Sequence, residues 1–303
     1  MNNLQNHVPV MLKEVLDYLK PRDGEVFIDC TFGAGGYTKG ILESANCKVI
    51  AIDRDPSVKK FADEIKSKFN ERFDFYNIKY SDVENILNEK QVDGIVLDIG
   101  VSSMQIDNAD RGFSFQKNSR LDMRMGSDKL SAYEIVNNTE ENELANIIYN
   151  YGDEVKSRHI AKKIVEQRKI KPIETTFELA DIVRYFYKGK CGKIDPATKT
   201  FQAIRIAVND ELNELRKILE LSKKILKKDG RLVVVSFHSL EDKIVKDFVK
   251  IETNKGEKKD KYSKSNKEAD FELLTNKAIS PSEDEVKRNV RARSAKLRAL
   301  KKC

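Results

Sequence analysis

Short apolar runs alternate with amphipathic stretches through the first hundred residues of the chain. Apolar runs of about four to eight residues between turn signals predict strands that are buried on both faces. The amphipathic stretches between them predict helices. Strands are expected at 26–29, 48–53, 73–78 and 93–100, with helices at 37–44, 56–69 and 81–88. This order predicts an α/β fold with a doubly wound parallel sheet.

The strand pattern stops after residue 106 and returns at 231–237, which read RLVVVSF. Helical periodicity fills the interval and predicts helices at 131–138, 141–152, 158–169 and 175–189. Such an interruption indicates a helical domain inserted into the sheet-bearing domain. We therefore expect a discontinuous α/β domain of residues 1–105 and 206–303, and an inserted all-helical domain of residues 106–205.

One long helix is predicted from Thr200 to about Lys227, with Gly230 just beyond its end. Apolar residues recur there at steps of three and four, at Phe201, Ile204, Val208, Leu212, Leu215 and Leu219. A second stripe of this helix holds Gln202, Arg205, Asn209 and Asn213. This polar stripe is either a solvated face or a functional surface.

The last fifty residues predict a loop and a closing pair of strands. Residues 250–270 are rich in lysine and lack apolar periodicity, which is typical of a flexible loop. The segments 271–276 and 294–300 then have the apolar content of two antiparallel strands.

The composition narrows the class of protein. The chain has 303 residues, a net charge of +7 and 40% hydrophobic residues, which describes a soluble protein with some preference for a polyanionic partner. Its four cysteines form no C-x-x-C pair and its three histidines are scattered, so we expect no bound metal and a reducing compartment. The N-terminus lacks a signal-peptide pattern, and no apolar run approaches a membrane span. A cytoplasmic protein is expected.

A glycine-rich turn follows the first predicted strand in FIDCTFGAGGYTKGI, at Gly33, Gly35 and Gly36. A dinucleotide fingerprint needs a third glycine where Thr38 stands, so the pyrophosphate cradle is incomplete. Acids end the second and fourth predicted strands, at Asp53 and Asp98. An acid in the first of these positions accepts hydrogen bonds from ribose hydroxyls. The pattern favours a ligand with an adenosine and no phosphate, such as S-adenosylmethionine, over a plain tight turn.

A run of motifs in this chain resembles the ribosomal RNA small subunit methyltransferase H family, the 16S rRNA cytosine-N4 methyltransferases. These motifs follow the family's order over nearly the whole chain: HVPVML (7–12), IDCTFGAGGYT (28–38), AIDRDP (51–56), DGIVLDIGVSSMQID (93–107), RGFSF (111–115), LDMRM (121–125), ATKTFQAIRIAVNDEL (197–212), SFHSLED (236–242) and NVRARSAKLRAL (289–300). The resemblance implies a class I S-adenosylmethionine-dependent methyltransferase fold with an inserted helical domain. It also implies methylation of N4 of a cytidine in 16S rRNA, with the small ribosomal subunit as partner, and is compatible with a homodimer.

The resemblance implies a set of cofactor contacts. These are Gly33, Gly35, Gly36, Tyr37, Asp53, Tyr80, Asp98 and Gln105. The chain departs from the family at several positions, with Tyr37 for the common His, Cys30 for Gly, Met104 for Pro and Ala207 for Trp. Tyr37 retains the ability to stack or to donate a hydrogen bond to the cofactor.

Methyl transfer from a sulfonium is an in-line displacement, which requires alignment of the reacting atoms more than a strong base. Acceptors for the cytosine amino group are expected at Asp98, Ser102 and Ser103; alternatively, Asp98 only orients the cofactor and the serines cap a turn. His238 is a candidate base or phosphate contact, and otherwise an ordinary surface histidine. Ser239 and Asp242 have the spacing of a helix-capping box.

Basic and aromatic residues near these motifs are candidate RNA contacts. They are Arg111, Phe113, Phe115, Arg124, Arg205, Asn209, Arg291 and Arg293. The alternatives are core packing for the phenylalanines and surface ion pairs for the arginines. Three other functions stay open from the residues alone: an NAD(P)-linked oxidoreductase, a methyltransferase of another RNA or of DNA, and a non-catalytic RNA-binding module.

Overall fold

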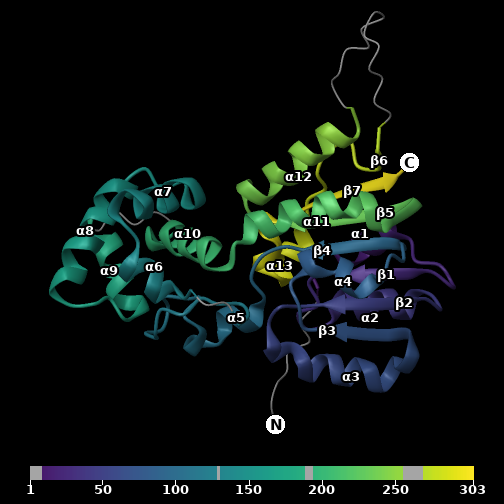
Figure 1. The fold of residues 1–303 in the computed structure, drawn as a ribbon, viewed down its shortest axis with the longest axis horizontal. Helices are drawn as coiled ribbons and strands as arrows, with labels where there is room; N and C mark the ends of the chain where they lie inside the picture. Colours follow the sequence, from purple (N-terminus) through teal and green to yellow (C-terminus); the bar gives the residue numbers. More distant parts are fainter. Residues whose placement is uncertain (1–8, 128–129, 188–193, 255–268) are drawn as a thin grey trace, which may run out of the picture. The chain divides into compact units, whose positions relative to one another are not determined.

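The computed structural model describes residues 9–127, 130–187, 194–254 and 269–303 (Figure 1). Two compact units divide the chain. The first comprises residues 1–100 and 212–303, and the second comprises residues 101–211. The residues predicted to form a lysine-rich loop lie largely outside the described part, at 255–268.

A seven-stranded sheet runs through the first unit in the order β3-β2-β1-β4-β5-β7-β6. Its strands are β1 (Val26–Asp29), β2 (Lys48–Ile52), β3 (Phe73–Tyr76), β4 (Val92–Asp98), β5 (Leu226–Ser236), β6 (Phe271–Leu273) and β7 (Lys296–Lys302). The first five pair in parallel, and β7 pairs antiparallel with both β5 and β6. The predicted parallel sheet and the closing antiparallel pair are both confirmed.

Helices cover both faces of this sheet. The α-helices are α1 (Leu12–Leu19), α2 (Gly36–Ser44), α3 (Lys59–Phe69), α4 (Glu84–Leu87), α11 (Glu211–Ile225), α12 (Ser239–Glu252) and α13 (Glu283–Arg288). Short 3₁₀ turns are η1 (Pro56–Val58), η2 (Asn70–Arg72), η3 (Tyr80–Asp82) and η5 (Val290–Ser294). Ile95 of β4 packs into the cluster that holds Leu215 of α11 and Phe248 of α12. Its neighbour Gly94 faces Leu19 of α1 instead, because successive residues of a strand point to opposite faces.

The described residues of the second unit form helices around their own apolar core. They are α5 (Ser103–Asp107), η4 (Ala109–Arg111), α6 (Ala132–Asn138), α7 (Glu141–Gly152), α8 (Ser157–Ile170), α9 (Thr176–Tyr185) and α10 (Ala197–Asn209). Fully buried Ile148, Ile164 and Leu179 bring α7, α8 and α9 together in this core. An isolated antiparallel bridge joins Arg120 to Thr175. The helices predicted in this region are confirmed.

The single helix predicted from Thr200 to Lys227 is wrong. Asp210 takes a left-handed conformation with φ 50° and ψ 34°, and its N–H donates to the carbonyl of Ile206, which ends α10. The next residue, Glu211, begins α11. One left-handed residue leaves the apolar spacing unchanged, so the periodicity carries no sign of the break.

Gly230 does not cap a helix, contrary to the prediction. The helix α11 ends at Ile225, and Gly230 lies inside β5. In the pairing of β4 with β5, Val92 lies opposite Leu226 and Gly94 lies opposite Arg231. The register therefore moves by five residues in β5 over an interval of two residues in β4. The surplus residues form a bulge, in which Asp229 has φ 64°.

Within the described part of the chain, every helix is too short or too polar to cross a membrane.

Gly152 provides a test of packing in the second unit. A Cβ atom added to this last residue of α7 would lie 2.4 Å from the backbone carbonyl oxygen of Lys199 in α10. We expect Gly152→Ala to lower the free energy of unfolding by about 1–3 kcal/mol, because the clash opposes the helix propensity that alanine gains. Urea unfolding measures this, with Asn150→Ala at an exposed position of α7 as the control. Equal stability of the two variants would contradict the packing described.

Candidate active site

Three adjacent strands, β2, β1 and β4, end at the same edge of the sheet. Asp53 directly follows β2, the glycine-rich loop follows β1, and Asp98 is the last residue of β4. In open parallel sheets, ligands bind outside the carboxyl ends of the strands. The candidate residues at 33–36, 53 and 98 therefore lie at the edge where this fold binds ligands.

The loop after β1 depends on its glycines. Gly33 and Gly35 have φ 53° and 77°, in the left-handed region that side chains disfavour. A Cβ at Gly35 would also lie 2.3 Å from Cδ1 of Ile65. The N–H of Gly33 donates to Oδ2 of Asp53 at 2.8 Å, so the turn after β1 is bonded to the residue after β2. Gly36 then begins α2.

Asp53 is an acid with an unusual environment. Oδ1 accepts from the N–H of Asp55 at 2.9 Å, while Oδ2 accepts from Gly33. Burial raises the pKa of Asp53 to about 6, against the lowering effect of these two backbone bonds. Its carboxyl group thus changes charge near physiological pH.

Asp29 is a residue of this edge that sequence reasoning missed. It is fully buried at the end of β1, where Oδ1 accepts from the N–H of Thr31 and Oδ2 from the hydroxyl of Thr38. These bonds join the start of the glycine loop to the first turns of α2. Burial raises the pKa of Asp29 to about 6. An acid that ends an apolar strand immediately before a glycine turn was the available signal.

Asp98 carries a carboxyl oxygen that is buried and has no hydrogen-bond partner among the described residues. Its backbone N–H donates to the hydroxyl of Thr31 at 2.6 Å, which ties the end of β4 to the glycine loop. Burial raises the pKa of Asp98 well above its usual range, and the negative charges of Asp29 and Glu241 raise it further. A cation or a hydrogen-bond donor placed beside Oδ1 would relieve this cost.

The two candidate tyrosines are arranged differently. Tyr37 is 3% exposed, and its hydroxyl donates to the carbonyl of Val10. That hydroxyl is therefore used inside the protein, so the hydrogen bond to a cofactor suggested by the sequence is not available in this structure. Tyr80 opens η3 and is half-buried, packed against the sheet's apolar core. It keeps an exposed part that a ligand could contact.

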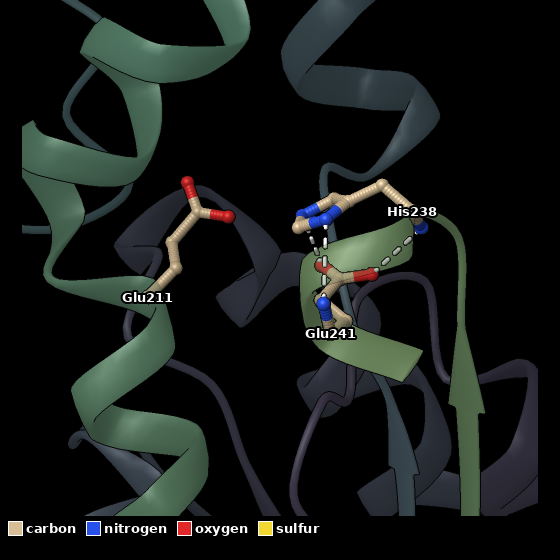
Figure 2. A group of neighbouring side chains, drawn as sticks. All are labelled: Glu211, His238 and Glu241. Carbon is tan, nitrogen blue, oxygen red and sulfur yellow. Dashed lines mark hydrogen bonds and ion pairs between the residues drawn. The ribbon is translucent and has the colours of Figure 1, made fainter. Parts of the chain in front are cut away.

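His238 caps a helix (Figure 2). Its Nδ1 accepts from the N–H of Glu241 at 3.4 Å, and its Nε2 lies 2.9 Å from Oε1 of the same residue. Fully buried Glu241 accepts in return from the N–H groups of Phe237 and His238. The capping pair is thus His238 with Glu241. The predicted pair of Ser239 and Asp242 is wrong, because the helix begins one residue earlier than that pair requires.

Asp242 instead accepts hydrogen bonds from Lys296 and Arg298 of β7. The histidine is only 13% exposed and its Nδ1 is occupied by the cap, so a structural role accounts for it without base catalysis. Glu211, also drawn in Figure 2, forms its ion pair with Arg205 of the second unit.

Ser102 and Gln105 form a capping box at the start of α5 in the second unit. The Ser102 hydroxyl accepts from the N–H of Gln105 at 3.2 Å, and Oε1 of Gln105 accepts from the N–H of Ser102 at 3.0 Å. The turn-capping interpretation therefore describes Ser102. Ser103 supplies the first residue of α5. Gln105 is 6% exposed, so little of its side chain is accessible.

Several candidate RNA contacts have partners within the second unit. Arg111 donates to the carbonyls of Arg124 and Met125 and lies over the ring of Phe113. Arg124 pairs with Asp122 at 2.7 Å. Phe115 packs edge-on against Phe201, with ring centroids 4.7 Å apart. Phe113 and Phe115 are both partly buried against the helical core, as the packing alternative expected.

The polar stripe of α10 is largely internal. Arg205 donates through two nitrogens to Glu211, each at 2.8 Å. Asn209 is fully buried, accepts from the N–H of Met125 and donates to the carbonyls of Met123 and Arg205. An RNA strand cannot reach Asn209, which is thus a structural residue. In the first unit, Arg291 and Arg293 of η5 are exposed.

Comparison with known proteins identifies the family of the chain. Residues 4–303 match the model of the MraW methylase family. The protein named ribosomal RNA small subunit methyltransferase H in Rickettsia massiliae is 59% identical over 302 residues, which cover 98% of both chains. Its namesake in Rickettsia akari is 58% identical over 303 residues, or 99% of both chains.

Among solved structures, an rRNA methylase from Streptococcus thermophilus covers 96% of this chain and 93% of that one, with a TM-score of 0.44 and 9% identity. A likeness this distant carries no conclusion about function. The family match spans almost the entire chain and the relatives are aligned from end to end. The chain belongs to the MraW methylase family.

Proposed function

We propose that this methylase transfers the methyl group of S-adenosylmethionine to the exocyclic N4 of a cytidine in 16S rRNA. The observation that carries the proposal is the glycine turn held between Asp53 and Asp98 on three adjacent strands. The family is one of methylases, and relatives of nearly 60% identity are named for the small-subunit rRNA. Cytidine N4 is the acceptor that the sequence motifs imply.

The residues fit a cationic ligand without phosphate. The proposed contacts are Gly33, Gly35 and Gly36 of the loop, with Asp53, Tyr80 and Asp98; Tyr37 contributes by shaping the loop. Gln105 is not among them, because its side chain is buried in the capping box of α5. A dinucleotide would need a complete cradle for its pyrophosphate. The buried, unpartnered oxygen of Asp98 suits a positively charged group instead, because a nearby cation favours the ionised carboxylate. When bound, S-adenosylmethionine supplies a methyl group activated by a sulfonium.

The protein's contribution to the chemistry is alignment and hydrogen bonding. An ionised Asp98 accepts an N–H from the cytosine amino group or from the cofactor, and so fixes the orientation of whichever it contacts. The nitrogen becomes cationic on methylation and loses its proton readily. A strong base is therefore not required, which agrees with a His238 that serves as a helix cap. Ser102 assists by capping α5, in the segment that follows β4.

RNA contacts are proposed at Arg291 and Arg293, whose side chains are exposed, and at Arg111, Arg124 and Arg205, whose guanidinium groups bind protein groups in this structure. We further propose that the helical second unit recognises rRNA and that the enzyme works in the cytoplasm, where the small subunit is assembled. The homodimer compatible with the resemblance stays a prediction.

Nucleoside mass spectrometry tests the reaction. Small ribosomal subunits that lack this modification are incubated with the protein and S-adenosylmethionine. We expect N4-methylcytidine from the wild type, and about a hundredfold slower formation with Asp98→Asn, which removes a charged acceptor at the reacting centre. The exposed Asp247→Asn of α12 is the matched control and should resemble the wild type. A methyl group on another base would refute the proposed reaction. Full activity of Asp98→Asn would refute the proposed role of Asp98.

Cofactor binding should depend on pH through Asp53. The pKa of Asp53 in the folded protein is about 6, so its carboxyl group ionises as the pH rises from about 5 to 7. The ionised form is the one that accepts hydrogen bonds from the ribose hydroxyls. We expect the dissociation constant for S-adenosylmethionine, measured by calorimetry, to fall over this range and then level off.

The variant Asp53→Asn should bind more weakly at pH 8 and show a shallower pH profile, since one titrating group is lost. The titrations of Asp29 and Asp98 remain in both proteins and set the residual slope. Superimposable profiles for wild type and variant would show that Asp53 does not contact the ligand.

A further inference from the structure

The peptide that joins Val10 to Met11 is hydrogen-bonded on both sides to segments distant in the sequence. Its carbonyl accepts from the hydroxyl of Tyr37, in the first turn of α2. Its N–H donates to Oε1 of Glu285 in α13 at 2.7 Å, across a separation of 274 residues. Each bond polarises the amide and so strengthens the other. A single peptide unit thus connects α2 with α13.

The backbone at this point is conformationally strained. Met11 is 1% exposed and has φ 53° and ψ 33°, a left-handed conformation that a non-glycine residue adopts only when its surroundings impose it. The bond from its own N–H to Glu285 is one of the contacts that impose it. Loss of this acceptor would leave a poorly accessible N–H without a partner and would allow the backbone to relax.

The same segment covers the entry of the glycine loop into α2. A Cβ atom added to Gly36 would lie 2.8 Å from Cβ of Pro9, so Pro9 rests directly on that glycine. Gly35, immediately before it, is left-handed with φ 77°. Movement of residues 9–11 would therefore be transmitted to the two loop glycines by van der Waals contact and to Tyr37 by its hydrogen bond.

We propose that Glu285 is a positioning residue for the cofactor loop, which it holds through the Val10–Met11 peptide and the Tyr37 hydroxyl. The identity of the ligand rests on the function proposed above; the contact between Glu285 and the loop does not. Arg291 and Arg293, the proposed RNA contacts, lie on η5 just after α13. The segment expected to meet the RNA thus also holds the loop expected to meet the cofactor.

The hydroxyl of Tyr37, which donates the hydrogen bond to Val10, does not ionise near neutral pH. Burial raises the pKa of the Tyr37 hydroxyl well above its usual range, and the negative charges of Asp98, Asp29, Glu285 and Glu14 raise it further. The Tyr37 hydroxyl therefore stays protonated at neutral pH and can donate its hydrogen bond to Val10.

Amide hydrogen exchange tests the proposal without any ligand. In Glu285→Ala we expect exchange within residues 35–40 to be at least several-fold faster than in the wild type, while residues 92–98 of the central strand β4 keep their protection. Glu283→Ala is the matched control, because Glu283 is exposed on the same helix. Tyr37→Phe removes the other bond to the peptide and should accelerate the same amides. Unchanged exchange at 35–40, or equal acceleration in β4, would overturn the proposal.

Cofactor binding supplies the functional measurement. We expect Glu285→Ala to raise the dissociation constant and the KM for S-adenosylmethionine about tenfold, with kcat at saturation unchanged. A change of this size corresponds to the loss of one charge-assisted hydrogen bond. Glu285→Gln keeps an acceptor oxygen and should restore most of the affinity.

The double variant Glu285→Ala/Tyr37→Phe should bind S-adenosylmethionine with nearly the same dissociation constant as whichever single variant binds it less tightly. Both changes release the same peptide, so their effects should not add. Losses that multiply, or wild-type affinity in Glu285→Ala, would refute the positioning role. If the wild type does not bind S-adenosylmethionine while exchange at 35–40 still responds to Glu285, the proposed function fails and the link between Glu285 and the loop stands.

Discussion

The candidate active site of this protein depends on carboxyl groups that are buried at the ends of the parallel strands. Asp29, Asp53 and Asp98 follow or end three adjacent strands, and burial raises the pKa of each. An acid in such a place is costly unless backbone N–H groups, hydroxyls or a ligand compensate for lost hydration. Asp29 and Asp53 obtain this compensation from the loop between them, which fixes the loop's conformation. Asp98 retains an oxygen without a partner among the described residues, so binding energy is available to a ligand there.

Polar residues that were candidates for RNA binding serve largely to hold the helical unit together. Asn209 bonds to two backbone groups of the segment around Met123 and Met125, and Arg205 is occupied by Glu211. Buried amides and paired guanidinium groups of this kind fix irregular chain that has no helix or strand of its own. The consequence for function is indirect for Asn209, which shapes the segment that carries LDMRM without offering its own atoms to a substrate.

The N-terminal and C-terminal segments meet the glycine loop from outside the parallel sheet. Pro9 packs on Gly36, and Glu285 reaches the loop through one peptide. Residues so far apart in the chain can shape one turn only because the sheet closes with β7, which returns the C-terminal part of the chain to the first unit. The conformation of the glycine loop therefore depends on residues from both terminal parts of the described chain as well as on the loop itself.

The sequence by itself determined the elements and the ligand-binding edge. Apolar runs and helical periodicity located every strand of the parallel sheet and the helices α6 to α9 of the second unit, since these patterns depend on local spacing. The carboxyl ends of parallel strands meet at one edge of a sheet, so the same pattern also places the glycine loop, Asp53 and Asp98 at that edge. Local spacing failed where one residue changed the backbone: left-handed Asp210 divides the long helix, and His238 caps α12 one residue before Ser239.

Only the tertiary structure decided which polar side chains form hydrogen bonds within the protein. Nothing near Asn209 in the sequence indicates that its amide is buried against Met123 and Met125, and nothing near Tyr37 indicates that its hydroxyl reaches Val10. The position of Glu285 beside Met11 is equally invisible to local pattern. Secondary structure follows from interactions within a few residues, whereas these hydrogen-bond partners are brought together by chain folding across separations of 27, 86 and 274 residues.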